Sequence, residues 1–288
     1  MKLGISGQAL GNVKSFREIV QIGKRLDIEN FEIWPCNVEV SADYGDADAS
    51  RITSLLKEEH VTVDCVTLGA AYDKDICSSP KTYEELLYHA IEFAARIGAK
   101  LVNHYCYWIS REEIPDLHRM EEFWAGPLDF AKREGICLVL ENEAHDSTRT
   151  PESMRTILDH FHDPFFKTNY DVTNYYHASC EGFPAGYEIL KPYIGYVHLK
   201  NGCLYREGAG QPDPHRGMPM SGLYAPTPIQ YAPIPDGAVN IAGLLFRLQE
   251  EKSYSGTCTL EPHTQPDFVE DFYRRESNWL RTLGFFQK

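Results

Sequence analysis

The sequence predicts an α/β protein in which eight strand–helix units close into one barrel, the (β/α)8 or TIM-barrel fold. Along the 288 residues, short apolar β-type runs alternate with longer stretches whose apolar residues recur at helical spacing. A single barrel of this kind takes roughly 250 residues, so one domain with an insertion accounts for the length. The turn after the first run, Gly4-Ile-Ser-Gly-Gln-Ala-Leu-Gly, lacks the GxGxxG spacing of a dinucleotide-binding doubly wound sheet.

Each expected element follows from its own pattern of apolar residues. The expected strands are residues 2–6, 31–33, 61–68, 100–103, 136–140, 166–170, 194–197 and 257–260. The expected helices are residues 16–26, 49–59, 80–98 and 112–134, one that opens at Thr150, and then 182–190, 241–251 and 267–283. Pro80 and Pro151 suit the first turn of a helix, and Gly98 suits a helix end. Gly126-Pro127 predicts a break in the fourth long helix.

Charge and cysteine usage restrict the class of partner. The net charge of −14 opposes long-range attraction to nucleic acid or to anionic membranes. No apolar run reaches the roughly 18 residues of a membrane span, and the first residues are too polar for a signal peptide. The eight cysteines form no CxxC pair, which disfavours a structural zinc site or a redox motif. We expect a cytoplasmic protein with a small-molecule partner, no nucleic-acid or membrane partner, and the capacity to form a homo-oligomer.

One segment, residues 202–237, interrupts the alternation of strands and helices. It is rich in proline and tyrosine and shows little periodicity. Because it follows the seventh strand, it should lie on the C-terminal rim, where the active sites of barrels form. We expect a long loop insertion within one domain of residues 1–288, acting either as a lid or as a packed surface insertion or oligomer contact.

Four of the expected strands end on a residue that commonly binds metals. Glu141 follows residues 136–140, Asp171 follows 166–170, His198 follows 194–197 and Glu261 follows 257–260. All strands of a parallel barrel end at the same rim, so these four side chains should converge there. Three carboxylates and one imidazole suit one divalent ion, Mn²⁺, Zn²⁺, Mg²⁺ or Co²⁺. Each residue alone is more often a rim charge or a helix cap, but together they predict a metal site.

The sequence around these residues resembles that of the xylose isomerase-like TIM barrels. The matching motifs are Leu-Val-Leu before Glu141-Asn142, then Tyr170-Asp171-Val172, Val197-His198-Leu199-Lys200 and Leu260-Glu261-Pro262. The most similar group is the sugar-phosphate isomerases and epimerases, and the chain also resembles ketose 3-epimerases, inosose dehydratases and endonuclease IV. The resemblance implies that Glu141, Asp171, His198 and Glu261 bind one divalent metal. It also implies that Glu141 and Glu261 act as the catalytic acid and base.

Two neighbouring residues depart from the pattern that this group shows after strands six and seven. Asn174 stands where epimerases of this type often have a substrate-binding histidine, and an amide can still hydrogen-bond a hydroxyl. Asn201 ends the run His198-Leu-Lys-Asn, where His-x-Lys-Asp is common. Lys200 itself keeps the pattern. It is either a substrate contact or one partner of an ion pair at the strand edge. These departures concern the substrate more than the metal.

Further candidates for contact with substrate follow other strands. His104 ends the fourth strand and is either a substrate contact or a rim histidine with satisfied hydrogen bonds. Trp34 and Trp108 could stack on the apolar face of a sugar or pack at the rim. Glu143 would point to the same side as Glu141 if the fifth strand continued, which makes it a possible substrate contact.

The residues and the resemblance together predict a metal-dependent isomerase or epimerase of a small sugar, ketose or sugar phosphate. Removing a proton next to a carbonyl needs a base at the C–H and a Lewis acid at the oxygen, which two glutamates and a divalent ion supply. The alternative is a dehydratase of a ketosugar or keto-inositol, which begins with the same proton abstraction. An endonuclease IV-like repair hydrolase is disfavoured by the −14 charge and by missing histidines, and a non-catalytic binding barrel by the complete ligand set.

Overall fold

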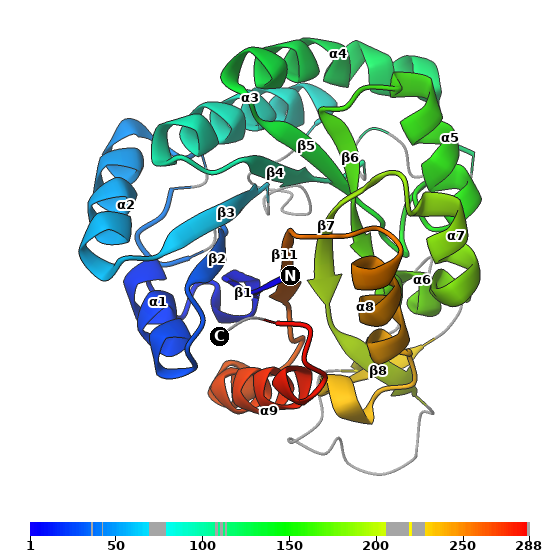
Figure 1. Cartoon of the computed structure of the whole chain (residues 1–288). Helices are drawn as coiled ribbons and strands as arrows, with labels where there is room; N and C mark the ends of the chain where they lie inside the picture. The colour runs from blue at the N-terminus through cyan, green and yellow to red at the C-terminus, as the bar shows by residue number, and fades with distance from the viewer. Residues whose placement is uncertain are drawn as a thin grey trace.

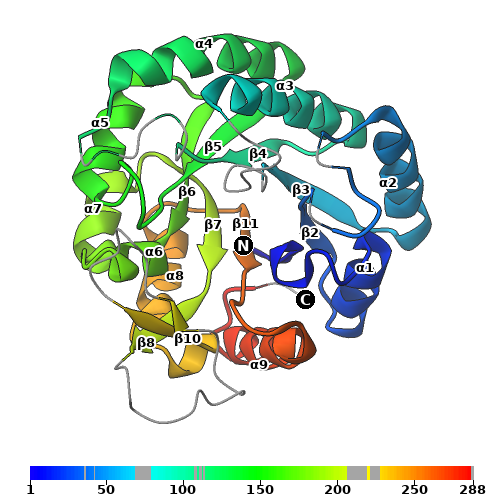
Figure 2. The same ribbon diagram turned by 180° about the vertical axis from the view of Figure 1, so that it is seen from behind.

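Eight parallel strands close into a barrel with helices around it, which confirms the predicted TIM barrel (Figure 1; Figure 2 shows it from behind). This computed structural model describes residues 1–35, 37–41, 43–68, 79–106, 109, 112, 114–205, 219–220 and 228–286. The strands are β1 (Lys2–Ser6), β2 (Asn30–Ile33), β3 (Thr62–Thr67), β4 (Leu101–His104), β5 (Cys137–Glu141), β6 (Phe166–Asp171), β7 (Ile194–Leu199) and β11 (Thr257–Leu260). Strand β11 pairs with both β7 and β1 and so closes the barrel.

The helices follow the strands in alternation, and local capping explains where several of them begin. They are α1 (Phe16–Arg25), α2 (Asp46–Glu59), α3 (Pro80–Ile97), α4 (Leu117–Glu134), α5 (Pro151–Phe161), α6 (Val172–His177), α7 (Tyr187–Leu190), α8 (Ile241–Glu250) and α9 (Val269–Thr282). Ser15, Ser79 and Thr150 each accept a hydrogen bond from a backbone N–H in the first turn of the helix that follows. Pro80 and Pro151 open their helices as predicted. Among the described residues, no helix is both long and apolar enough to cross a membrane.

Helix α4 runs through Pro127 without interruption, so the predicted break at Gly126-Pro127 is wrong. The helix also starts at Leu117 rather than at residue 112. A proline inside a helix removes one hydrogen bond and crowds the preceding turn. Here α4 packs against α3, and a side chain at Gly126 would collide with the Tyr88 hydroxyl of α3. Packing between the two helices therefore outweighs the local preference of the Gly-Pro pair.

The barrel interior is polar at the C-terminal ends of the strands, although it is enclosed by apolar layers. Strand residues alternate between this interior and the layer beneath the helices. The buried interior side chains at this level include Glu32, Thr67, Asn103, Glu141, Asn169, Asp171, His198 and Thr259. Two residues earlier in β3, β5 and β7, the apolar cluster of Cys65, Val139 and Tyr196 lies beneath them. The fold thus places a polar layer directly above an apolar one inside the barrel.

The segment 202–237 contains ordered strands in its described part, where the sequence suggested a loop. Strands β8 (Asn201–Leu204), β9 (Pro219–Met220) and β10 (Ile229–Ala232) form an antiparallel sheet in the order β8-β10-β9. This sheet lies on the α8–α9 side of the barrel in both views (Figures 1 and 2). The Asn201 amide links the start of β8 to the segment that follows β10, because Nδ2 donates to the carbonyls of Ile234 and Val239, each at 2.9 Å. Residues 206–218 and 221–227, which make up most of the expected lid, lie outside the described residues.

Candidate metal centre

Four buried side chains converge at the C-terminal end of the barrel interior. They are the residues that the sequence singled out: Glu141, Asp171, His198 and Glu261. One ligand atom from each lies within 4.8 Å of the other three. Glu141 and Asp171 end β5 and β6, His198 lies in β7, and Glu261 follows β11. Strands 5, 6, 7 and 11 are neighbours in the barrel, so this convergence is a direct result of the topology.

The carboxylate of Glu141 is oriented by two asparagines from adjacent strands. Asn103 Nδ2 lies 2.8 Å and Asn169 Nδ2 lies 3.2 Å from Glu141 Oε2. The two amides also bond to each other, with Asn169 Nδ2 donating to Asn103 Oδ1 at 3.1 Å. Glu141 Oε1 therefore faces the centre of the group, 3.1 Å from His198 Nδ1.

Asp171 divides its two oxygens between a helix cap and the site. Oδ1 accepts hydrogen bonds from the backbone N–H groups of Thr173 and Asn174, at 2.9 and 3.0 Å, and so caps the unpredicted helix α6. Oδ2 is buried and accepts no hydrogen bond from the described residues, although Lys200 Nζ lies 2.9 Å away. Burial raises the pKa of Asp171, and the charge of Glu141 adds to this effect. The charge of Lys200 lowers that pKa but does not compensate. Negative charge at this point is therefore incompletely compensated, which suits a cation.

His198 presents one ring nitrogen to the four-residue group and the other to Glu32. Its Nδ1 lies 3.1 Å from Glu141 Oε1 and 3.4 Å from Glu261 Oε2. Its Nε2 lies 2.6 Å from Glu32 Oε2. Burial disfavours the charged ring, but Glu141, Glu261 and Glu32 outweigh it and raise the pKa of His198 well above its ordinary value.

Lys200 lies beside the group as a buried cation. Its Nζ donates to Glu261 Oε2 at 2.8 Å and lies 3.3 Å from His263 Nε2. Burial lowers the pKa of the ammonium, but Asp171 and Glu261 outweigh it and raise that pKa well above the usual value. Lys200 forms the buried ion pairs that were one of its two predicted roles. It also borders the cavity, and its contact with substrate stays a prediction. By formal charge, the four carboxylates of Glu32, Glu141, Asp171 and Glu261 outnumber the two cationic side chains beside them, Lys200 and His198.

A cavity of about 270 Å³ opens onto the group. Its size is close to the lower limit of roughly 300 Å³ for small-molecule pockets. Its walls are formed by Gln8, Trp34, Tyr105, Glu141, Glu143, His145, Asn174, Lys200, Tyr231, Glu261 and His263. The wall combines the aromatic side chains of Trp34, Tyr105 and Tyr231 with carboxylate, amide, imidazole and ammonium groups. This mixture suits a ligand that has both hydroxyl groups and an apolar face.

Of the six expected substrate contacts, four border this cavity and His104 does not. Trp34, Glu143, Asn174 and Lys200 all contribute to its wall. His104 is buried on the opposite side of β4, where its ring lies 5.0 Å from Trp124 in an edge-on contact. Because strand side chains alternate, Asn103 faces the barrel interior and His104 must face the helices. The substrate contact considered for His104 is therefore withdrawn. Trp108 lies outside the described residues.

The sequence did not identify several residues of the cavity wall. Tyr231 comes from β10 in the insertion, and its ring stacks on His263 with centroids 4.4 Å apart. Gln8 and Tyr105 follow β1 and β4. His145 follows β5, and its ring meets the edge of His177 at 5.5 Å. The position of His263, two residues after Glu261, was a usable signal, whereas nothing in the sequence of β10 pointed to the cavity.

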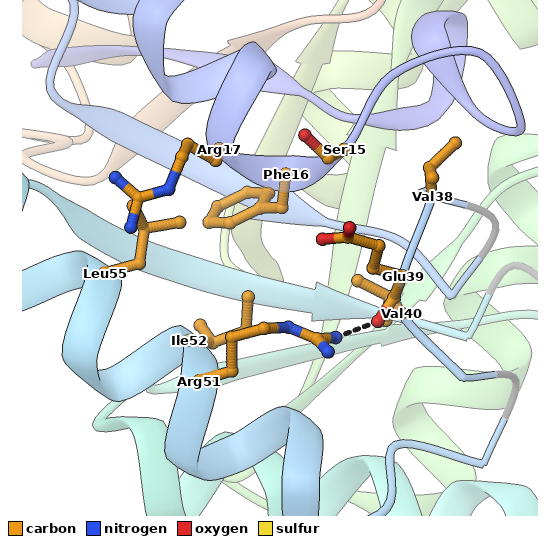
Figure 3. A pocket seen from close by; sticks show the side chains of 9 residues that line it. All are labelled: Ser15, Phe16, Arg17, Val38, Glu39, Val40, Arg51, Ile52 and Leu55. Carbon is orange, nitrogen blue, oxygen red and sulfur yellow. Dashed lines mark hydrogen bonds between the residues drawn. The ribbon is translucent and has the colours of Figure 1, made fainter.

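A second hollow, of about 300 Å³, lies outside the barrel between α1 and α2 (Figure 3). It is lined by Ser15, Phe16, Arg17, Val38, Glu39, Val40, Arg51, Ile52 and Leu55. The Arg51 guanidinium, one of the lining groups, donates to the backbone carbonyl of Glu39, as the dashed line in Figure 3 shows. None of the four candidate ligands borders it, so it is separate from the candidate metal centre.

The chain belongs to the xylose isomerase-like TIM barrel family, whose model matches residues 20–286. This confirms the resemblance found in the sequence. No curated protein matches the sequence.

Solved structures of low sequence identity share the fold. A xylose isomerase-like TIM barrel protein from Mycobacterium smegmatis, in complex with magnesium, superposes with a TM-score of 0.73 at 16% identity, covering 99% of this chain and 98% of that one. D-allulose 3-epimerase from a Methylomonas species, in complex with D-allulose, gives 0.70 at 17% identity, with 98% and 96% covered. The probable 3-DHS dehydratase AsbF from Bacillus anthracis gives 0.69 at 16% identity, with 98% and 99% covered.

Proposed function

We propose that the protein is a divalent-metal-dependent isomerase or epimerase of a small sugar, ketose or sugar phosphate. The observation that carries this proposal is that Glu141 and Glu261 belong both to the four-residue ligand group and to the cavity wall. A substrate in the cavity would therefore touch the ligands themselves. Membership of the family and the structural likeness to D-allulose 3-epimerase agree with this type of reaction.

The four-residue group has the donors that a divalent cation needs. Glu141, Asp171, His198 and Glu261 would hold the ion through three carboxylates and one imidazole, a set that suits Mn²⁺, Mg²⁺, Co²⁺ or Zn²⁺. Asp171 Oδ2, which pairs with Lys200 but accepts no hydrogen bond from the described residues, supports this fit, as does the formal excess of carboxylates over cations. When bound, the ion would polarise the substrate carbonyl and make the adjacent C–H more acidic.

The protein's own side chains would then move the proton and orient the substrate. For epimerisation, one of Glu141 and Glu261 takes the proton from carbon and the other returns it on the opposite face. For isomerisation between adjacent carbons, a single carboxylate suffices. Lys200 and Asn174 would donate to substrate oxygens, and Trp34 would pack on the apolar face of the sugar.

A dehydratase remains the second candidate, favoured by one specific observation. Glu143 adds a third carboxyl group to the same cavity, beside Glu141 and Glu261. Loss of a hydroxyl from the carbon next to the deprotonated one requires a proton donor, and Glu143 could supply that proton. The structural likeness to a probable dehydratase is consistent with this reaction.

The mass of the product separates the two reactions. The protein, loaded in turn with Mn²⁺, Mg²⁺, Co²⁺ and Zn²⁺, would be incubated with a panel of free and phosphorylated ketoses and keto-inositols, and the products analysed by mass spectrometry and chiral chromatography. We expect a product with the mass of its substrate. A product lighter by one water would establish the dehydratase instead. Absence of any product across the panel with every metal would overturn both.

A further inference from the structure

Glu32 lies in the barrel interior next to the candidate metal centre, but it is neither one of the four ligands nor part of the cavity wall. It is carried by β2, and none of its surface is exposed. The cavity wall includes Trp34, two residues later, but not Glu32 itself. A role for this carboxylate must therefore act through its neighbours rather than through direct contact with substrate.

Four donor groups surround the Glu32 carboxylate. On Oε1 these are the Thr67 hydroxyl at 2.5 Å and Trp34 Nε1 at 2.7 Å. On Oε2 these are the Tyr196 hydroxyl at 2.9 Å and His198 Nε2 at 2.6 Å. An ionised carboxylate only accepts hydrogen bonds and has about four lone-pair positions, so this donor set matches it closely. A buried charge is costly unless it is hydrogen-bonded in this way.

The position of Glu32 decides which nitrogen of His198 is free. A neutral imidazole carries one proton, on either Nδ1 or Nε2. Nδ1 faces Glu141 and Glu261, so a cation held there would take the Nδ1 lone pair. The single proton of the neutral ring would then lie on Nε2, where Glu32 Oε2, 2.6 Å away, can accept it. Carboxylate partners of this kind fix the tautomer and ring orientation of metal-binding histidines.

We propose that Glu32 is a positioning residue that holds His198 in its Nε2–H form and aims Nδ1 at the cation. This inference rests on the metal of the proposed function. Through Trp34 Nε1, the same carboxylate also fixes one wall of the cavity relative to the metal ligand. One buried group on β2 thus joins the metal site and the substrate cavity, although it belongs to neither.

The test uses zinc as the probe and compares two buried carboxylates. In Glu32→Gln, an amide with only one acceptor oxygen replaces the carboxylate at nearly unchanged volume. The matched control is Glu276→Gln, which alters another fully buried carboxylate, on α9, that accepts from the backbone N–H of Ile234. Zinc affinity by competition with a chelator should weaken about ten- to a hundredfold in Glu32→Gln and remain within twofold of wild type in Glu276→Gln.

The tautomer itself is measured by ¹⁵N NMR of the histidine rings in the zinc-loaded protein, with the His198 signals assigned from His198→Gln. We expect the wild type to carry its proton on Nε2. A proton on Nδ1 in the wild type would overturn the inference even if Glu32→Gln failed to fold. Unchanged zinc affinity and tautomer in a folded Glu32→Gln would overturn it as well. A wild type that binds no divalent metal would overturn the proposed function and this inference together, whereas the other outcomes leave the proposed function intact.

Discussion

His104 and His198 are equally buried at the C-terminal ends of barrel strands, but they lie in opposite surroundings. His104 faces the helical layer, where its ring meets Trp124 and Phe166 edge-on at 5.0 and 5.7 Å. Burial lowers the pKa of His104 to about 3. His198 faces the interior, where the surrounding carboxylates outweigh burial and raise its pKa well above the ordinary value. The comparison teaches that the side of the strand a residue occupies decides its chemistry, more than its burial or its position along the strand.

The largest expected effect on activity concerns Glu141 and Glu261, the two candidate ligands that also line the cavity. We expect Glu141→Gln and Glu261→Gln to keep the fold and to lower turnover of the substrate found in the panel by roughly 10²- to 10⁴-fold, because each removes a carboxylate that we propose to transfer the proton. Steady-state kinetics at saturating metal would measure this loss. Glu276→Gln serves as the control and should keep wild-type turnover. Wild-type turnover in either of the first two variants would remove that glutamate from the proton-transfer role.

The two histidines themselves provide the next test, through metal affinity. His198→Gln should weaken binding of Mn²⁺ or Zn²⁺ by at least about a hundredfold, because it removes a ligand of the group. His104→Gln should change that affinity by less than twofold, because the side chain faces the helices. Isothermal titration calorimetry on the two variants measures both. Equal losses of metal affinity in the two variants would contradict the assignment of His198 to the metal site and of His104 to the helix-facing side of its strand.

The pH dependence of the free energy of unfolding should show that His104, on the helix-facing side of β4, stays neutral in the folded protein. Below pH 6.5 an unfolded chain protonates His104, whereas the folded protein keeps it neutral down to a pKa of about 3. The unfolded state therefore binds more protons in this window, and stability falls as the pH is lowered through it, by up to roughly 1.4 kcal/mol per pH unit. Urea unfolding at pH 7 and pH 5 should show a smaller loss in His104→Gln than in wild type. An equal loss in both would contradict the neutral, buried state of His104.

The smallest effect is expected where strand β10 of the segment 202–237 contacts the cavity wall. Tyr231→Ala removes the ring that stacks on His263 in the cavity wall. Such a contact contributes about 0.5–1.5 kcal/mol to holding the His263 ring in place. If all of this is lost from substrate binding, KM rises by at most roughly tenfold. The kcat and the metal affinity should stay near wild type, because Tyr231 is not one of the four ligands. A large fall in kcat with unchanged KM would place Tyr231 in the proton-transfer machinery instead.

The sequence predicted the barrel and the convergence of the four candidate ligands because both depend on local patterns. An apolar run that ends on Glu141 or His198 shows where the strand stops, and parallel topology brings the strand ends together. Asn103 and His104 show the limit of this reasoning. His104 was predicted to end its strand, as it does, but a shift of one residue at a strand end exchanges the inner face for the outer one, and Asn103 takes the inner position.

Other features depended on contacts that no local pattern contains. Helix α4 continues through Pro127 because α3 packs against it, and α6 is too short to show a helical period. Tyr231 reaches the cavity because its strand, β10, pairs with β8. Strand β10 lies in the segment 202–237, whose sequence shows little periodicity. These features depend on tertiary packing, which sequence periodicity does not report.

Solvent-deuterium incorporation tests the central claim most directly. The metal-loaded protein would be incubated in D₂O with the ketose that it turns over, and the substrate and product examined by NMR, with a chelated sample alongside. Proton transfer by the inner carboxylates next to a metal-bound carbonyl predicts deuterium on the carbon adjacent to the carbonyl, and loss of that incorporation on chelation. Incorporation at an undiminished rate after the metal has been removed would contradict the claim.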